Sequence, residues 1–134
     1  MIKQVAHLCF VVKDLAASEE FYCRKLGLAP AFDFINDAGK KFGVYLHAGR
    51  GTFIELFVGE SQPPTQRDAY RHLCLQVDDL PSEVARLREL GVKVTEPKQG
   101  SDHSWQAWLN DPDGLPIELH QYTPQSKQAP WAEV

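Results

Sequence analysis

The sequence lacks the features that mark membrane proteins and nucleic-acid-binding proteins. No apolar run approaches the roughly 20 residues that a membrane-spanning helix needs. No basic run is present either, and 14 Lys and Arg against 18 Asp and Glu give a formal net charge of -4. We therefore expect a small-molecule substrate, and neither a membrane nor a nucleic acid as partner.

Cysteine is scarce as well. The chain has three, Cys9, Cys23 and Cys74, which is an odd number. The N-terminal stretch 1–12 is partly apolar but has no small-residue cleavage site of the kind that ends a signal peptide. Both observations favour a cytoplasmic protein with reduced thiols over an exported protein with disulfides.

The most informative feature that is present is an internal repeat. Residues 7–15 read "HLCFVVKDL" and residues 72–80 read "HLCLQVDDL", which agree at six of nine positions. Two shorter pairs follow in the same order, "RKLGL" at 24–28 with "RELGV" at 88–92, and "IEL" at 54–56 with "IEL" at 117–119. The offsets of 65, 64 and 63 residues between the copies indicate a duplicated structural unit.

Each copy is predicted to contain one helix and four strands. The helices begin after Asp14 and Asp79, whose side chains suit a helix N-cap, and they end at Gly27 and Gly91. Strands are expected at 5–12, 30–36, 42–48 and 52–58 in the first copy, and at 70–77, 92–96, 104–110 and 115–122 in the second. Each copy is thus a βαβββ module, and the fold class is α+β.

The two modules are expected to form a single domain over residues 1–134. Module one spans about 4–58, module two spans about 70–123, and a polar linker with two prolines occupies 59–69. Residues 124–134 are expected to form a loosely held tail.

Two glutamates stand in unusually apolar strands. Glu55 lies between Ile54 and Leu56, and Glu118 has equivalent neighbours in the second copy. Charged residues seldom occupy such strands unless they are paired or bind a metal. If the copies pack about an approximate two-fold axis, Glu55 and Glu118 meet the repeated histidines His7 and His72. Two imidazoles and two carboxylates suit one divalent transition metal, namely Ni, Zn, Co, Mn or Fe.

A rival metal site would use the cysteines of the repeat. His7, Cys9, His72 and Cys74 would make a Cys₂His₂ zinc centre. Residues two apart on a strand are about 6.6 Å apart along it, which suits a single tetrahedral ion poorly. The rival site also leaves both glutamates unexplained, so we expect the cysteines to pack beside the metal.

Several further residues are weaker candidates for the substrate pocket, because ordinary packing or surface exposure explains each of them equally well. Aromatic side chains could form an apolar wall, residues on the face of His72 could line the cavity, and two further histidines could reach the substrate or Glu118. These candidates are Phe57, Cys74, Gln76, His103, Trp105, Trp108 and His120.

The segments "AHLCFVVKDLAASEEFYCRKLGL", "FIELF", "RHLCLQVDDL" and "NDPDGLPIELHQY" resemble the vicinal oxygen chelate superfamily. This superfamily includes glyoxalases, bleomycin resistance proteins and extradiol dioxygenases, and the resemblance covers about residues 4–123. It implies that the two modules form a curved mixed sheet around a metal site. It also implies a homodimer, in which metal sites can be shared between chains.

The order His-Glu-His-Glu is most similar to glyoxalase I, the lactoylglutathione lyase. This resemblance implies a metal-dependent lyase or isomerase that chelates vicinal oxygens of an α-hydroxy carbonyl or hemithioacetal. Glu118 or Glu55 would be the catalytic base that moves a proton through an enediolate. The resemblance implies no organic cofactor, with glutathione as an optional co-substrate.

The chain departs from bacterial glyoxalases at two positions that contact glutathione in those enzymes. Val11 stands where they have arginine, and Gly59 stands where they have asparagine. These departures leave glutathione recognition open, and with it a glyoxalase-like lyase or isomerase for another substrate. Two alternative functions also stay open. One is an extradiol-type dioxygenase that uses Fe, and the other is a non-catalytic small-molecule binding or resistance protein.

Overall fold

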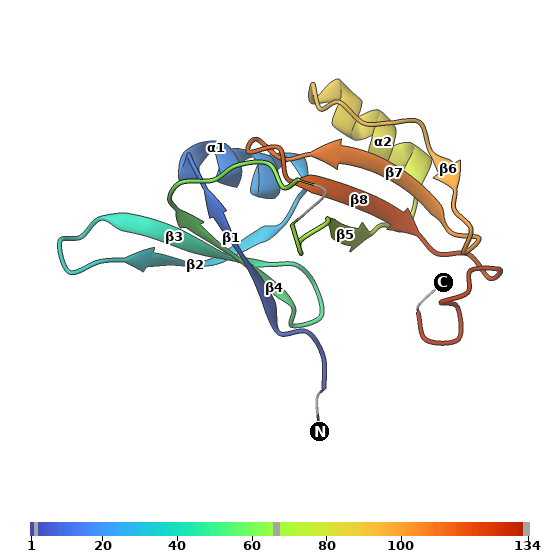
Figure 1. The fold of residues 1–134 in the computed structure, drawn as a ribbon, viewed down its shortest axis with the longest axis horizontal. Coiled ribbons are helices and arrows are strands. Elements are labelled where there is room, and N and C mark those ends of the chain that lie inside the picture. Colours follow the sequence, from blue (N-terminus) through green and yellow to red (C-terminus); the bar gives the residue numbers. More distant parts are fainter. Residues whose placement is uncertain (2, 66–67, 133–134) are drawn as a thin grey trace. The chain divides into compact units, whose positions relative to one another are not determined.

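The computed structural model describes residues 1, 3–65 and 68–132. The chain divides into two compact units, Met1–Gln62 and Pro63–Val134, and each contains its own four-stranded sheet (Figure 1). Each unit has a first strand, a helical segment and three further strands. The predicted α+β class and the two tandem βαβββ modules are therefore confirmed.

The sheet of unit one has the strand order β1-β4-β3-β2. Its strands are β1 (His7–Val12), β2 (Ala29–Ile35), β3 (Lys41–His47) and β4 (Phe53–Val58). β1 runs parallel to β4, whereas the other neighbouring strands are antiparallel. The parallel pairing places the first and last strands of the module side by side, although they are about forty residues apart in the chain.

One face of this sheet forms the core of unit one and the other face carries aromatic and polar side chains. Val44, Leu46, Ile54 and Leu56 are fully or almost fully buried. Because successive side chains of a strand alternate, Glu55 faces away from this core.

The helical segment of unit one differs from the prediction of one regular α-helix. α1 (Leu15–Glu19) begins at Asp14, whose side chain accepts a hydrogen bond from Ala17 N at 3.0 Å. From Glu20 to Lys25 the segment continues as a π-helix, η1. Leu28 N then donates to Tyr22 O at 2.9 Å, and this wide turn precedes the strand that follows.

The sheet of unit two repeats this arrangement in the order β5-β8-β7-β6. Its strands are β5 (Leu73–Gln76), β6 (Lys98–Gln99), β7 (Trp105–Asn110) and β8 (Pro116–Gln121), with β5 parallel to β8. α2 (Leu80–Glu89) begins at Asp79 and buries Leu80, Val84 and Leu87. Gly91, with φ of 77°, follows the helix as predicted.

The prediction of a strand at 92–96 is wrong. The structure instead places the short strand β6 at Lys98–Gln99. Thr95 N donates to Trp108 O, but Trp108 N donates to the Thr95 side-chain Oγ1 and not to a backbone carbonyl. The Thr95 side chain thus takes the place of a backbone carbonyl as acceptor in the regular β-ladder. Pro97 has no backbone N–H and cannot donate a ladder hydrogen bond.

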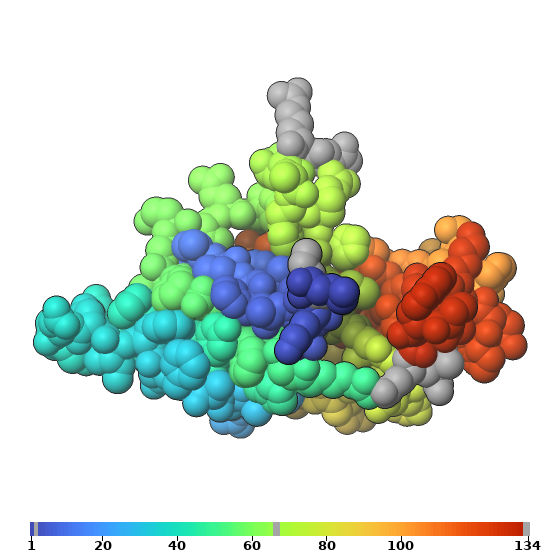
Figure 2. Space-filling view, turned by 90° about the horizontal axis from the view of Figure 1, so that it is seen from below, coloured from blue at the N-terminus to red at the C-terminus, as the bar shows by residue number. Residues whose placement is uncertain are grey.

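The segment after β8 is held more firmly than the prediction of a loose tail. Ser126 is buried, and its Oγ lies 2.8 Å from Ser104 Oγ. Lys127 N donates to Asp102 O at 2.9 Å. The outer surface of the segment is visible in red in Figure 2, and Trp131 lies almost fully exposed on it.

The structure bears on two expectations from the composition, which concern the cysteines and membrane-spanning helices. Cys9, Cys23 and Cys74 are all free. Among the described residues, none of the helices has both the length and the apolar character to cross a bilayer.

Candidate metal centre

The repeated histidine and glutamate of unit one lie together. His7 opens β1 and Glu55 lies in the middle of the parallel strand β4, which brings His7 Nε2 to 4.0 Å from Glu55 Oε2. Tyr45 is the β3 partner of Glu55 in the register, and its ring meets the His7 ring edge-on at 5.7 Å. The carboxylate therefore lies beside an imidazole, on the strand next to Tyr45.

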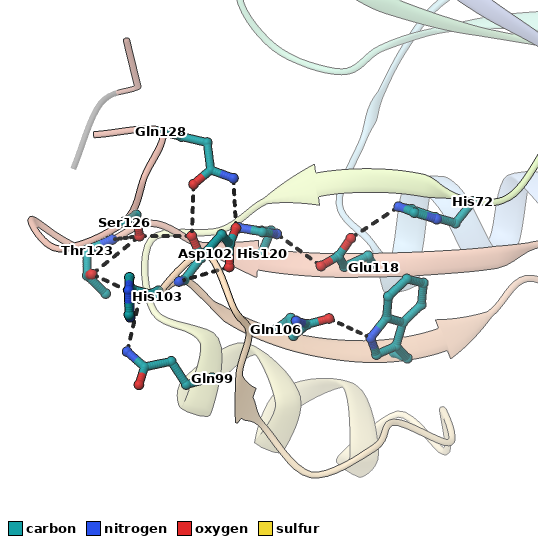
Figure 3. A network of polar contacts seen from close by, with 12 residues as sticks. His72, Gln99, Asp102, His103, Gln106, Glu118, His120, Thr123, Ser126 and Gln128 are labelled. Atoms are coloured by element: carbon teal, nitrogen blue, oxygen red, sulfur yellow. Dashed lines mark hydrogen bonds and ion pairs between the residues drawn. The ribbon is translucent and has the colours of Figure 1, made fainter. Parts of the chain in front are cut away.

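Unit two places the equivalent residues in the same way. His72 precedes β5, and its Nε2 lies 3.2 Å from Glu118 Oε2 on β8, as Figure 3 shows. Trp108 is the β7 partner of Glu118, and its ring meets His72 edge-on at 4.9 Å. Trp108 is thus the repeat equivalent of Tyr45. Tyr45 was missed in the sequence, although it is aromatic and lies 63 positions before Trp108.

Each glutamate also has a cysteine beside it. Cys9 pairs with Glu55 across β1 and β4, and Cys74 pairs with Glu118 across β5 and β8. Burial raises the pKa of the Cys9 thiol, with a further contribution from Glu55. Burial and then Glu118 raise the pKa of Cys74 to about 12, although part of Cys74 is open to solvent. Protonated thiols that donate to the carboxylates fit the prediction of cysteines as neighbours of the metal.

The two units differ on the other side of the glutamates. His120, on β8, is 7% exposed, and its Nδ1 lies 3.0 Å from Glu118 Oε1. Its Nε2 lies 3.4 Å from Asp102 Oδ2 (Figure 3). The twin of His120 in the first repeat is Phe57, which packs against Phe34 and Phe42. Only the second glutamate therefore has a histidine next to it on the same strand.

Asp102 is a polar residue of this site that sequence reasoning missed. It lies in the turn between β6 and β7, where one aspartate among several polar residues gives no recognisable signal. Gln128 Nε2 donates to Asp102 Oδ2 at 2.7 Å, and this bond is the main cause of the lowered pKa of the Asp102 carboxyl.

The weaker pocket candidates have varied surroundings. Gln76 is the β5 partner of His120 in the register, which places it beside the centre. Trp105 is 41% exposed at the start of β7. The His103 carbonyl accepts hydrogen bonds from Gln99 and Thr123, and the backbone φ of 67° identifies a tight turn. A role of these residues in binding substrate stays a prediction.

The donor atoms of both units fit a divalent transition metal. Each unit offers an imidazole Nε2 and a carboxylate oxygen close together, and these are ligands that Zn²⁺, Ni²⁺, Co²⁺, Mn²⁺ and Fe²⁺ accept. In unit two Cys74, Glu118 and His120 also hold three potential ligand atoms within 4.8 Å of one another. The described residues thus include a group able to bind a metal ion.

A family model described as the Glyoxalase/Bleomycin resistance protein/Dioxygenase superfamily matches residues 4–119. The chain is 33% identical over 126 residues to the uncharacterized protein YaeR of Escherichia coli, covering 90% of this chain and 97% of YaeR. It is 30% identical over 124 residues to the glutathione transferase FosA of Serratia marcescens, covering 90% and 82% of the two chains. The crystal structure of SMU.1112c matches with a TM-score of 0.79 and 27% identity, covering 90% and 99%.

Proposed function

Because the chain belongs to the Glyoxalase/Bleomycin resistance protein/Dioxygenase superfamily, we propose that it is a metal-dependent lyase or isomerase of the glyoxalase I type. Its substrate is a small molecule with two adjacent oxygens, such as an α-hydroxy carbonyl or a hemithioacetal. The observation that carries this proposal is the pairing of one histidine with one glutamate in each unit, at 4.0 Å and 3.2 Å.

In this proposal His7, Glu55, His72 and Glu118 hold one divalent ion. The two pairs join either within one chain or between the chains of a homodimer. The ion, when bound, supplies a Lewis acid that polarises the substrate carbonyl and offers room for two substrate oxygens. The two carboxylates balance the charge of the ion, and the rings of Tyr45 and Trp108 flank the two histidines.

Glu55 is the better candidate for the catalytic base. The His120 contact restrains Glu118, whereas the equivalent position beside Glu55 holds Phe57, which has no polar atom. A carboxylate without this restraint can turn toward the substrate and take the C–H proton on one of its oxygens. The carboxyl group exchanges this proton with solvent and then protonates the adjacent carbon, which completes an isomerisation.

The surroundings of Glu55 favour a substrate other than a glutathione adduct. Gly59 N donates to Val12 O at 2.9 Å, so Gly59 continues the pairing of β1 with β4. A Cβ added at Gly59 would lie 2.9 Å from Val11 Cγ1, which leaves little room there for an asparagine side chain. The two positions that contact glutathione in bacterial glyoxalases thus form one small apolar patch in this chain.

Incorporation of solvent deuterium tests the proposed proton transfer. Protein loaded with Ni²⁺, Zn²⁺ or Co²⁺ is incubated in D₂O with a panel of α-hydroxy ketones and hemithioacetals, and the carbon-bound deuterium is measured by NMR. We expect exchange that Glu55→Gln abolishes and that the exposed control Glu60→Gln retains. Exchange that persists in Glu55→Gln contradicts the role of Glu55, and absence of exchange in every metal form contradicts the proposed reaction.

A second candidate function is small-molecule binding without turnover. The observation that favours it is a row of aromatic rings on unit one, in which Tyr45 stacks on both Phe32 and Phe53 at 4.8 Å. Such a row can hold a planar ligand by stacking alone. Saturable binding of a planar aromatic compound without deuterium exchange would favour this candidate.

Fe²⁺-dependent oxygen consumption with catechols would instead indicate a dioxygenase.

A further inference from the structure

The histidine beside Glu118 has an unusual environment. His120 is 7% exposed, and each of its ring nitrogens faces a carboxylate oxygen, Glu118 Oε1 at 3.0 Å and Asp102 Oδ2 at 3.4 Å. The Nε2 atom is buried and has no partner with hydrogen-bond geometry among the described residues. Burial of a polar ring between two acids costs free energy, so a stabilising or functional role is expected to offset it.

Asp102, which lies behind His120, is itself restrained. Gln128 Nε2 donates to Asp102 Oδ2 at 2.7 Å, and Ser104 N donates to Oδ1 at 3.2 Å. Lys127 N donates to the Asp102 carbonyl at 2.9 Å. The segment that follows β8 therefore returns to the turn that carries Asp102, and Gln128 of this segment bonds to the Asp102 side chain (Figure 3).

The contact between His120 and Glu118 determines which carboxylate oxygen is free. With Nδ1–H donating to Oε1, the other oxygen, Oε2, remains directed at His72 Nε2, 3.2 Å away. This is the orientation in which Glu118 and His72 can bind the same ion. A histidine that donates a hydrogen bond to a ligating carboxylate holds that carboxylate in one orientation before the metal binds. Less side-chain entropy is therefore lost on metal binding.

We propose that His120 is a positioning residue that holds Glu118 as the fixed carboxylate ligand of the metal, with Asp102, which Gln128 restrains from the C-terminal segment, facing the other nitrogen of its ring. This inference rests on the proposed metal centre. It explains the difference between the two halves of the repeat: Glu118 has a histidine on its own strand that restrains it, and Glu55 has Phe57 at the equivalent position.

Metal affinity and the electronic spectrum of the Co²⁺ form test the proposal directly. His120→Phe introduces the residue that stands at the twin position, and it should weaken Co²⁺ binding by about 10–100-fold, the range for lost partners of metal ligands. It should also change the visible d–d absorption, because Glu118 becomes free to change its coordination.

His120→Asn should restore most of the lost affinity, because its amide nitrogen stands near the position of Nδ1 and can donate to Glu118. Asp102→Asn should give a smaller loss than His120→Phe, because the contact from His120 Nδ1 to Glu118 is kept and the Asn amide nitrogen can donate to His120 Nε2. Gln99→Ala is the matched control, since the Gln99 side chain donates to the His103 carbonyl at the edge of the same network. Its affinity and spectrum should equal those of the wild type.

Unchanged affinity and an unchanged Co²⁺ spectrum in folded His120→Phe would overturn the inference while leaving the proposed function intact. Failure of the wild-type protein to bind any metal would overturn the proposed function. In that case long-range ¹H–¹⁵N correlation of the metal-free protein still decides the contact. A proton on His120 Nδ1 supports it, whereas a ring protonated only at Nε2 contradicts it.

Discussion

Replacement of each glutamate by glutamine should affect metal affinity unequally. Both carboxylates have a histidine and a cysteine nearby, so Glu118→Gln and Glu55→Gln each remove contacts of these two kinds. The contact without an equivalent at Glu55 is the one from His120 Nδ1 to Glu118 Oε1 at 3.0 Å. The difference between the two variants therefore measures this contact.

The amide of glutamine has one oxygen and one nitrogen, so it cannot replace both oxygens of Glu118. If the amide oxygen accepts from His120, the NH₂ group faces the metal and cannot bind it. If the amide oxygen faces the metal, the NH₂ group faces the N–H of His120 and a hydrogen bond to a charged group is lost. Glutamine at position 55 is free to turn its oxygen toward the metal.

A hydrogen bond to a charged group contributes about 1.5–3 kcal/mol. This corresponds to about a 10–150-fold difference in Kd between the two variants. Competition with a chromophoric chelator for Co²⁺ or Zn²⁺ measures both constants, and circular dichroism verifies that each variant is folded. Equal losses, or a larger loss for Glu55→Gln, would refute the reasoning.

Four further substitutions test the fold. Gly43→Ala should lower the free energy of unfolding by about 1–3 kcal/mol in urea, because a Cβ there would lie 2.5 Å from Phe57 Cδ1. Gly59→Ala should destabilise the protein less when Val11→Ala is present, since the added Cβ would lie 2.9 Å from Val11 Cγ1, and a double-mutant cycle measures this coupling. Asp79→Ala should lower the melting temperature at neutral pH, because the carboxylate caps α2.

The Asp79 effect has a predicted pH dependence. The bonds from the side chain and backbone of Ser82 lower the pKa of the Asp79 carboxyl below 3.8. The stabilisation is therefore complete above 3.8 and is lost as the pH falls through the lower, folded-state pKa. Melting curves of wild type and Asp79→Ala should converge at acidic pH, whereas the exposed neighbour Asp78→Ala should match wild type throughout. A difference that persists in acid would contradict this account.

The larger part of the fold could be predicted from the sequence because repetition and alternation are local signals. The duplicated phrase identified two modules, and the apolar residues around Glu55 showed which strand faces would be buried. The prediction of a strand was wrong at 92–96, where the Thr95 side chain, and not a backbone carbonyl, accepts the hydrogen bond from Trp108 N. It also missed the π-helical turns after Glu19, which depend on the wide hydrogen bonds of one short segment.

The histidine and glutamate of each module were predictable as neighbours for a topological reason. A βαβββ module that pairs its first strand parallel to its last brings His7 to Glu55 and His72 to Glu118. Asp102 had no such signal, since its place beside His120 results from a turn and from a bond to Gln128. Contacts that depend on turns and on the segment after the last strand leave no periodic trace in a sequence.

The difference between the two modules carries more functional information than their similarity. Identical halves would give two equivalent carboxylates, and neither would be suited more than the other to leave the metal. The chain has Phe57 after the first glutamate and His120 after the second, at the same position of the repeat. The proposed restrained ligand and the proposed mobile base would need these opposite surroundings, one polar and one apolar. The exchange of these two side chains, Phe57→His with His120→Phe, should therefore transfer the greater sensitivity of metal affinity from Glu118→Gln to Glu55→Gln.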